Sequence, residues 1–226
     1  MAVTAAVLRR WNANDRRTQA SRIASAAVLA LCDLPDRVVL GLGGGPMLIH
    51  PKIVNVNIEP FANVTVVGDA HRLPIADNSV DAVHCEAVFE HLADPHIAAA
   101  EMQRVMKPGA IAFVCTPFMQ SFHGYPSHCQ NFTHVGHCRL FDRAGLEIVE
   151  SGTCVGPAWT LTGIILAFLS TYLPRVLRWP ALAAWTIFSL MFIRPLDRWL
   201  ASSDQAYVLA STTYVLVRKP ITGPAE

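Results

Sequence analysis

The sequence predicts an α/β protein with a doubly wound, Rossmann-like sheet of seven strands, of which the last is antiparallel. Short β-branched runs alternate with polar or helical stretches between Arg37 and Cys115. These runs are almost continuously apolar, which is typical of parallel strands covered on both faces. Two more strand-like runs follow, at 146–152 and 207–219, and a long apolar insertion separates them. A sixth and a seventh strand of this kind indicate the antiparallel partner.

A helical lead-in, residues 1–36, is expected ahead of the sheet. Arginines crowd its apolar run at 23–31, and Leu31 before Cys32 is not the small residue that a lipoprotein signal requires, so an amphipathic helix is favoured over a cleaved signal. The first five strands are expected at 37–42, 53–59, 63–70, 79–86 and 110–117.

Two helices are predicted from their start and stop residues. The first begins at Asp94, with Pro95 in its first turn, and ends at the break formed by Pro108 and Gly109. Thr133 is expected to cap the second, which runs to Ala144 and is closed by Gly145.

The composition excludes one class of partner and favours one compartment. Of the 226 residues, 52% are hydrophobic and 15% are charged, so one sizeable domain with an apolar surplus is expected. The formal net charge is +1 and no long basic run occurs, so the electrostatic footprint of a nucleic-acid-binding protein is absent. The six cysteines show no CxxC spacing, which favours reduced thiols in the cytoplasm.

A glycine loop follows the first predicted strand. It has the sequence GLGGGP at 41–46, and ligands of open α/β sheets bind at the carboxyl ends of the strands. Gly43 and Gly45 permit positive φ and let the backbone approach a ligand closely. An ordinary tight turn is the structural alternative.

Acidic or small residues follow the next three strands. Glu59 comes after the second strand, where its carboxylate can bond two ribose hydroxyls. Asp69 after the third can meet an exocyclic amine, and its small neighbour Ala70 leaves room for a flat ring. Cys85 and Glu86 follow the fourth strand. Each acid alone is more often a solvated strand end, but three in register with a glycine loop indicate a binding site.

The segments VVLGLGGGP, VNVNIEP, VVGDAHRLPIADNSVDAVHCEAVFEHL and EMQRVMKPGAIAFVCTPF resemble the class I S-adenosylmethionine-dependent methyltransferases. Within them they are similar to a branch often associated with surface-polysaccharide biosynthesis. The resemblance runs from about 37 to 152 and includes the final strand. It implies S-adenosylmethionine as cofactor and methyl transfer to a small molecule, a sugar or a lipid-linked saccharide.

The same resemblance implies a role for each residue after the strands. Gly43 and Gly45 would border the methionine part of the cofactor, and Glu59 would hold the ribose. Asp69 and Ala70 would flank the adenine. The resemblance places Cys85 and Glu86 near the sulfonium.

Two other functions fit parts of the pattern. A dehydrogenase requires G-x-G-x-x-G, but the third glycine is replaced by Pro46 when counted from Gly41 and by Leu48 when counted from Gly43. The other is a catalytically degenerate, membrane-associated binding or scaffold protein. It is favoured by Gly41, where the family usually has an acid, and by the short stretch left for a helix after Pro46.

Four histidines and two cysteines lie in FHGYPSHCQNFTHVGHC, at 122–138. Because the fifth strand ends at Pro117, residues 118–132 are expected to form a lid over the carboxyl edge of the sheet. The related branch commonly shows a pattern like HGYPSHCQNFT here, which points to His123 first and His128 second as substrate-facing groups, one of them a base. The alternative is that they only order the lid through hydrogen bonds.

The last two histidines of this stretch, His134 and His137, are expected on the following helix as packing residues. No metal is expected, because the stretch lacks the compact paired spacing of zinc ligands.

The apolar insertion at 158–200 interrupts a methyltransferase domain predicted at 37–157 and 201–219, and 220–226 form a tail. Its uncharged runs, 159–173 and 181–193, are shorter than the roughly 20 residues that a spanning helix needs.

Two short helices on a membrane surface, with tryptophans near the headgroups and arginines at the turns, are favoured. Packing on the domain or on a second subunit is the alternative, ahead of a spanning hairpin. The favoured interpretation implies a cytoplasmic protein peripheral on the inner face of the membrane.

Overall fold

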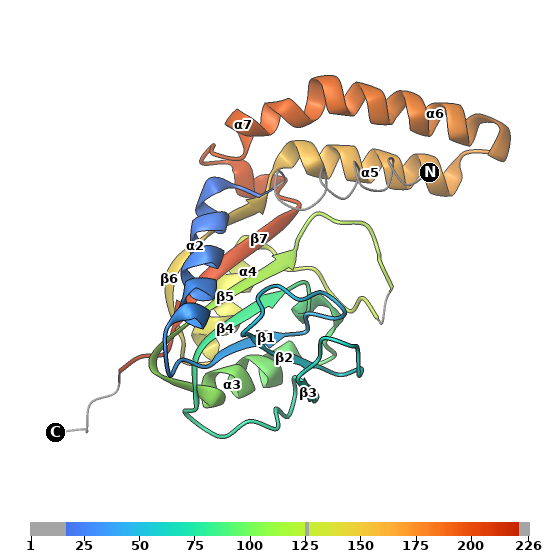
Figure 1. The fold of residues 1–226 in the computed structure, drawn as a ribbon. Coiled ribbons are helices and arrows are strands. Elements are labelled where there is room, and N and C mark those ends of the chain that lie inside the picture. Colours follow the sequence, from blue (N-terminus) through green and yellow to red (C-terminus); the bar gives the residue numbers. More distant parts are fainter. Residues whose placement is uncertain (1–16, 125–126, 222–226) are drawn as a thin grey trace.

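The computed structural model describes residues 17–124 and 127–221 (Figure 1). Residues 1–16 of the predicted lead-in, 125–126 of the predicted lid and 222–226 of the predicted tail lie outside the described residues. Seven strands form one sheet in the order β3-β2-β1-β4-β5-β7-β6. The strands are β1 (Val39–Leu42), β2 (Val54–Asn57), β3 (Val66–Val67), β4 (Val80–Glu86), β5 (Met106–Pro117), β6 (Glu147–Val155) and β7 (Thr212–Arg218).

The strand directions confirm the predicted fold class. β1 to β5 are parallel to their neighbours, whereas β7 lies antiparallel between β5 and β6. The strand order reverses between β1 and β4, and ligands of open α/β sheets bind at such a point. The segments that leave β1 and β4 are therefore the first candidates for the functional site.

Helices cover both faces of the sheet and enclose two apolar cores. Helix α2 (Gln19–Leu29) packs against β4, β5 and β6, whereas α4 (His134–Arg143) packs against β6 and β7 on the other face (Figure 1). Helix α3 (Pro95–Val105) contributes Ala98 and Met102 to the larger core, where they join fully buried residues of β1 and β4.

The helix ends follow the predicted capping pattern. The Thr133 hydroxyl accepts a hydrogen bond from the backbone N–H of Gly136 at 3.1 Å and caps α4. Gly145 has φ +79° directly after that helix, as expected of a C′ glycine. Pro95 occupies the first turn of α3, where its missing N–H leaves no bond unmade. The lead-in is helical from Gln19, where Thr18 caps α2.

No helix joins the first four strands. Residues 43–79 contain only turns, bends and the strands β2 and β3. The short helix expected after the glycine loop is therefore absent, because prolines at 46 and 51 interrupt the connection and only a few residues lie between them. A dinucleotide would place its pyrophosphate on a helix N-terminus at this point. The absence of that helix argues against the dehydrogenase alternative.

Two predicted boundaries were wrong. Helix α3 ends at Val105 and β5 begins at Met106, so Pro108 and Gly109 lie inside the strand. The pairing with β4 shifts there and Gly109 adopts φ +81°, so the break is a strand irregularity and not a helix stop. The last strand begins at Thr212 instead of 207, because residues 206–208 form a short 3-10 turn.

The insertion forms a helical hairpin that projects from the sheet (Figure 1). Helix α5 (Pro157–Tyr172) runs outward, and α6 (Arg175–Phe188) returns and continues through a π turn, a 3-10 turn and α7 (Asp197–Leu200). The second uncharged run was expected to begin at 181, after Pro180, but Pro180 lies within α6, in its second turn, where it removes only the hydrogen bond to the Val176 carbonyl.

The returning helix, Arg175–Leu200, is consequently longer than predicted. It has 26 residues, and its most apolar 18-residue window has mean hydropathy 1.6, with 6% of that window buried. By length and composition alone it could cross a membrane. Helix α5 has 16 residues.

Candidate active site

The glycine loop lies at the carboxyl end of β1, beside the segment that leaves β4. Gly43 has φ +72° and Gly45 has φ +55°, so both adopt the left-handed conformation that glycine accommodates. A Cβ on Gly43 would lie 2.3 Å from Cγ2 of Val88. Close packing against Val88 therefore requires the glycine at 43, independently of any ligand. The loop also packs on Asn55, whose Oδ1 would lie 2.9 Å from a Cβ on Gly44.

The two acids that follow β2 and β3 both lie on the surface. Glu59 is exposed, and its backbone N–H donates to Oδ1 of Asn57 at 3.2 Å. Asp69 accepts from the backbone N–H of His71 at 2.9 Å and contacts Nδ1 of the same histidine at 2.7 Å, both through Oδ1. These two bonds lower the pKa of Asp69, so the carboxylate is anionic near neutral pH. Ala70 is buried beside it.

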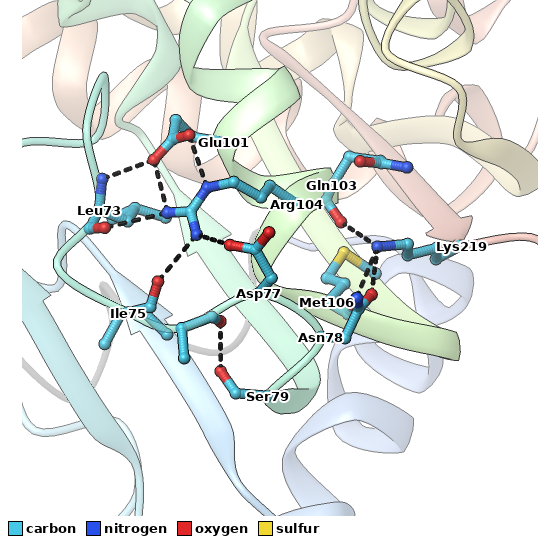
Figure 2. Close-up of polar contacts among 11 residues, drawn as sticks. Leu73, Ile75, Asp77, Asn78, Ser79, Glu101, Gln103, Arg104, Met106 and Lys219 are labelled. Carbon is cyan, nitrogen blue, oxygen red and sulfur yellow. Dashed lines mark hydrogen bonds and ion pairs between the residues drawn. The ribbon is translucent and has the colours of Figure 1, made fainter.

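A polar clamp fixes the segment that follows Asp69 to helix α3, as Figure 2 shows. The guanidinium of Arg104 donates to the backbone carbonyls of Leu73 and Ile75, each at 3.0 Å, and pairs with Asp77. Glu101 accepts from Arg104 and, at 2.8 Å, from the backbone N–H of Leu73. The clamp thereby holds the turn that carries Asp69 against the body of the domain.

The two residues at the end of β4 point to opposite faces of the sheet. The Cys85 thiol is fully buried in the larger core, and burial raises its pKa well above the usual value. Any contact of Cys85 to a ligand would have to come from its backbone. Glu86 lies on the face covered by α2, where it pairs with Arg17, two residues before that helix, and Oε1 lies 3.2 Å from Nε2 of His84 in β4. Burial opposes ionisation of Glu86, but His84 and Arg17 lower its pKa overall.

Directly after β4, the 3-10 turn η2 (Phe89–His91) brings together three groups from two segments. Oε1 of Glu90 lies 3.7 Å from Nε2 of His91 and 3.9 Å from Nε2 of His123. The Glu90 side chain is fully buried, and among the described residues neither of its carboxylate oxygens has a hydrogen-bond partner. Burial raises the pKa of Glu90 to about 7.

The lid, residues 118–132, is tied to η2 by its backbone. The backbone N–H of Cys129 donates to the Glu90 carbonyl at 2.8 Å, and the side-chain Nε2 of Gln130 donates to the backbone carbonyls of Phe89 and Leu92. His128 is held at both ring nitrogens: Nδ1 accepts from the backbone N–H of His123 at 3.2 Å, and Nε2 lies 2.7 Å from Oδ1 of Asn131.

The next two histidines lie on α4, as predicted. His137 is fully buried, and its Nδ1 lies 3.0 Å from the hydroxyl of Thr213. Burial lowers its pKa to about 3, so it is a neutral packing residue. His134 bonds Ser151 through Nε2 at 3.0 Å.

Two cavities lie at the base of the hairpin and share Trp159 and Arg194 as lining residues. One of about 1220 Å³ reaches from α2 to the hairpin and is also lined by Arg17 and Tyr207. The other, of about 330 Å³, lies between the first residues of the lid and α5. Arg17 connects the larger cavity to the end of β4 through its ion pair with Glu86.

Glu90 and His91 were not predicted as site residues. Their signal was the run FEHLADP after the fourth strand, which places an acid and a histidine at the reversal in strand order. His123 was predicted together with the cysteines and histidines of its own stretch, whereas in the structure it faces residues more than 30 positions earlier.

Comparisons with known proteins show similarity to methyltransferases. A family model described as a methyltransferase domain matches residues 49–114. An uncharacterised methyltransferase of Mycolicibacterium paratuberculosis is 28% identical over 192 residues, which cover 70% of this chain and 71% of the relative. An uncharacterised 37.1 kDa protein in a transposon of Streptomyces fradiae is 33% identical over 81 residues. That match covers 36% of this chain and 23% of the relative, so the chain spans less than two thirds of that protein.

A solved structure shares the fold. The putative sarcosine dimethylglycine methyltransferase of Galdieria sulphuraria superposes with a TM-score of 0.57 at 16% identity. The superposition covers 90% of this chain and 86% of the other.

Proposed function

We propose that the chain is a class I S-adenosylmethionine-dependent methyltransferase and that it methylates a hydroxyl group of a lipid-linked saccharide at a membrane surface. One observation carries the proposal. The glycine loop, the turn with Asp69, the lid and the base of the apolar hairpin all lie where β1 to β6 present their carboxyl ends (Figure 1). A cofactor, an acceptor and a lipid surface can therefore meet at one edge of the sheet.

The residues after β1, β2 and β3 fit the cofactor. Gly43 and Gly45 have no side chains, so the methionine part of S-adenosylmethionine can lie against the backbone of their loop. The anionic Asp69 can accept a hydrogen bond from the adenine amine, beside the small Ala70. Exposed Glu59 can hold the ribose hydroxyls. The backbone of Cys85 and the carboxylate of Glu86 border the reacting end.

The chain's own chemical task is orientation and proton transfer. When bound, S-adenosylmethionine supplies a methyl group carried on a sulfonium. The sulfur leaves as a neutral thioether, so the leaving group needs no protonation. We assign proton acceptance to His123, because its Nδ1 is 3.1 Å from the Ser121 carbonyl and so carries the proton, leaving an Nε2 lone pair. The acceptor hydroxyl gives its proton to this Nε2, and Glu90 stabilises the imidazolium. His128 holds the lid in place, and the lid excludes water.

The cavities at the hairpin base suit a glycan with an anionic link to lipid. Aromatic rings of Trp159 and Tyr207 line the larger cavity and can stack on sugar rings. The guanidinium of Arg198 lines it too, and arginine binds phosphate oxygens in a fork geometry. We keep the domain boundaries expected from the sequence, with a methyltransferase domain at 37–157 and 201–219. The insertion at 158–200 lies on the side where the acceptor would bind.

We place the hairpin on the membrane surface and not across it. Helix α5 has 16 residues, about 24 Å at 1.5 Å per residue, against a hydrocarbon thickness of about 30 Å. Arg175 and Arg178 lie at the hairpin tip, where insertion would bury both charges. Apolar side chains of the hairpin are nevertheless exposed, including Trp179 at 74%. The protein is thus assigned to the inner face of the membrane, on the cytoplasmic side.

The test combines vesicle binding with methyl transfer. The protein should float with anionic vesicles, and the double variant Val176→Ser, Trp179→Ser should lose most of that binding. Val135→Ser is the matched control, because Val135 is an exposed apolar residue on α4. With labelled S-adenosylmethionine, a lipid-linked saccharide should be methylated faster than the same saccharide free in solution. Equal rates, or flotation unchanged in the double variant, would refute the membrane-surface proposal.

A further inference from the structure

The histidine pair that faces Glu90 is held in one tautomer by the backbone. Nδ1 of His91 contacts the carbonyl oxygen of Ser127, and Nδ1 of His123 contacts that of Ser121. A carbonyl oxygen only accepts hydrogen bonds, so both Nδ1 atoms carry the proton. Both Nε2 atoms therefore present lone pairs, and both face the same carboxylate oxygen.

The three facing atoms are all electron-pair donors. One ligand atom from each of Glu90, His91 and His123 lies within 4.8 Å of the other two. The separations of 3.7 and 3.9 Å are too long for direct hydrogen bonds. A fully buried carboxylate without a partner costs free energy, and a cation among the three donors would remove that cost. The arrangement is that of a cation site.

We propose that Glu90, His91 and His123 bind a zinc ion at the acceptor side of the active site. Two imidazoles with one carboxylate favour zinc over magnesium, which prefers oxygen ligands. Two ligands on one tetrahedral zinc ion lie roughly 3.4 Å apart, since each bond is about 2.1 Å long. The two separations from Glu90, 3.7 and 3.9 Å, need to shorten by only a few tenths of an ångström, and the two Nε2 atoms, which lie within 4.8 Å of each other, need to approach as the ion binds.

The surroundings of the three donors match those of a zinc site. Histidines that bind zinc usually donate their other N–H to a carbonyl or carboxylate, as both imidazoles do here. The His123 side chain is 41% exposed, which gives the ion a path from solvent. Cys129 lies close by, with Sγ 3.7 Å from the His91 carbonyl oxygen, but it is not one of the three facing ligands.

Three protein ligands leave one position open, as in catalytic zinc sites. We assign this position to water in the resting protein and to the acceptor hydroxyl during turnover, a step that rests on the proposed function. With zinc bound, the Nε2 lone pair of His123 would be a ligand, and the ion would lower the pKa of the acceptor hydroxyl, whose proton would pass to the water that the hydroxyl displaces. In the zinc-free protein the same lone pair acts as the base described above.

The experiment measures zinc directly. Protein purified without a metal-affinity tag is stripped with a chelator and titrated with Zn²⁺ against a chromophoric competitor. We expect one equivalent to bind. Because loss of an outer-shell partner alone weakens zinc by about 10–100-fold, Glu90→Gln, His91→Ala and His123→Ala should each weaken it by more than about 100-fold. Co²⁺ should give a visible tetrahedral spectrum that the same variants lose.

Two control variants separate this site from adventitious binding. His96→Ala removes an exposed imidazole of α3, and Cys129→Ser removes the nearby thiol. Both should keep wild-type affinity. The proposal is overturned if the wild type binds no tighter than His123→Ala, or if Cys129→Ser alone abolishes binding. Circular dichroism checks the folding of each variant, and His123 is exposed enough that its variant should fold.

Failure of the zinc site and failure of the proposed function remain distinguishable. The zinc titration uses neither cofactor nor acceptor, whereas S-adenosylhomocysteine binding is measured on the stripped protein. Zinc binding without cofactor binding would contradict the methyltransferase account alone. Cofactor binding without zinc would contradict only the metal site.

Discussion

Replacing Glu90 by glutamine in the zinc-free protein should stabilise it at alkaline pH. The side chain is fully buried, and burial raises its pKa from 4.5 to about 7. A carboxyl whose folded pKa exceeds its unfolded pKa contributes stability that is complete below pH 4.5 and is lost as pH rises through 7. At 1.36 kcal/mol per pH unit the loss is about 3 kcal/mol, and glutamine, which does not ionise, avoids it.

The assay is denaturant unfolding of the wild type and Glu90→Gln at pH 4.5 and pH 8, with a chelator present. The two proteins should differ little at pH 4.5, and the variant should be more stable by about 3 kcal/mol at pH 8. In thermal melts this corresponds to roughly 6–12 °C. Glu147→Gln, at an exposed position of β6, should change stability by less than about 0.5 kcal/mol at both pH values.

The His91 and His123 imidazoles face the same carboxylate from η2 and the lid, and both remain in the variant. A constant difference between Glu90→Gln and the wild type across this pH range would refute the reasoning. So would a variant that is less stable at pH 8, because that result would mean that the charged carboxylate has a partner in the folded protein.

Gly43→Ala should cost about 1–3 kcal/mol and abolish S-adenosylhomocysteine binding, because its Cβ would meet Val88 at 2.3 Å in a left-handed backbone. Gly145→Ala is the control, because Gly145 has φ +79° but no atom within 4 Å of an added Cβ. It should cost only the backbone strain, about 1 kcal/mol, and should keep S-adenosylhomocysteine binding. Equal effects of Gly43→Ala and Gly145→Ala would contradict the packing argument. Arg104→Ala should cost about 2–3 kcal/mol in unfolding free energy and weaken S-adenosylhomocysteine in calorimetry, since the turn after Asp69 loses its clamp. Unchanged affinity in a folded Arg104→Ala protein would mean that the clamp does not position the cofactor.

The predictable part of the fold rests on local patterns. Continuous apolar runs such as 110–115 require burial on both faces, and runs of this kind predicted the parallel strands and the position of the glycine loop. Capping by Thr133 and closure by Gly145 are equally local, and both are confirmed. The boundaries that were wrong depend on long-range pairing. Gly109 donates its N–H to the Lys219 carbonyl at 2.8 Å, a bond that no local pattern predicts.

The sequence predicted that the candidate residues lie at the carboxyl ends of the strands, but it did not predict the contacts that their side chains make. Side chains alternate between the two faces of a strand, so Cys85 and Glu86 lie on opposite faces of β4. They cannot both face the sulfonium with their side chains. Glu90 faces His123 because the lid packs back onto η2. The sequence of neither segment alone predicts this contact. The helical hairpin was predicted, but Pro180 was given too much weight as a helix breaker.

The scaffold alternative is not favoured. Its support was Gly41 and the short stretch left for a helix after Pro46. A Cβ at Gly41 would lie 3.0 Å from Cδ1 of Ile53, so the small residue there has a packing reason. The methyltransferase-domain match and the methyltransferase relatives favour an enzyme.

The most direct test of the central claim is calorimetric titration of the protein with S-adenosylhomocysteine. The account predicts one site per chain in the wild type. Asp69→Asn should weaken it by about 10–100-fold, because an amide keeps the acceptor for His71 but loses the charge offered to the adenine amine. Asp142→Asn, at an exposed position of α4, should bind as the wild type does. A wild-type protein that binds neither S-adenosylmethionine nor S-adenosylhomocysteine would contradict the account.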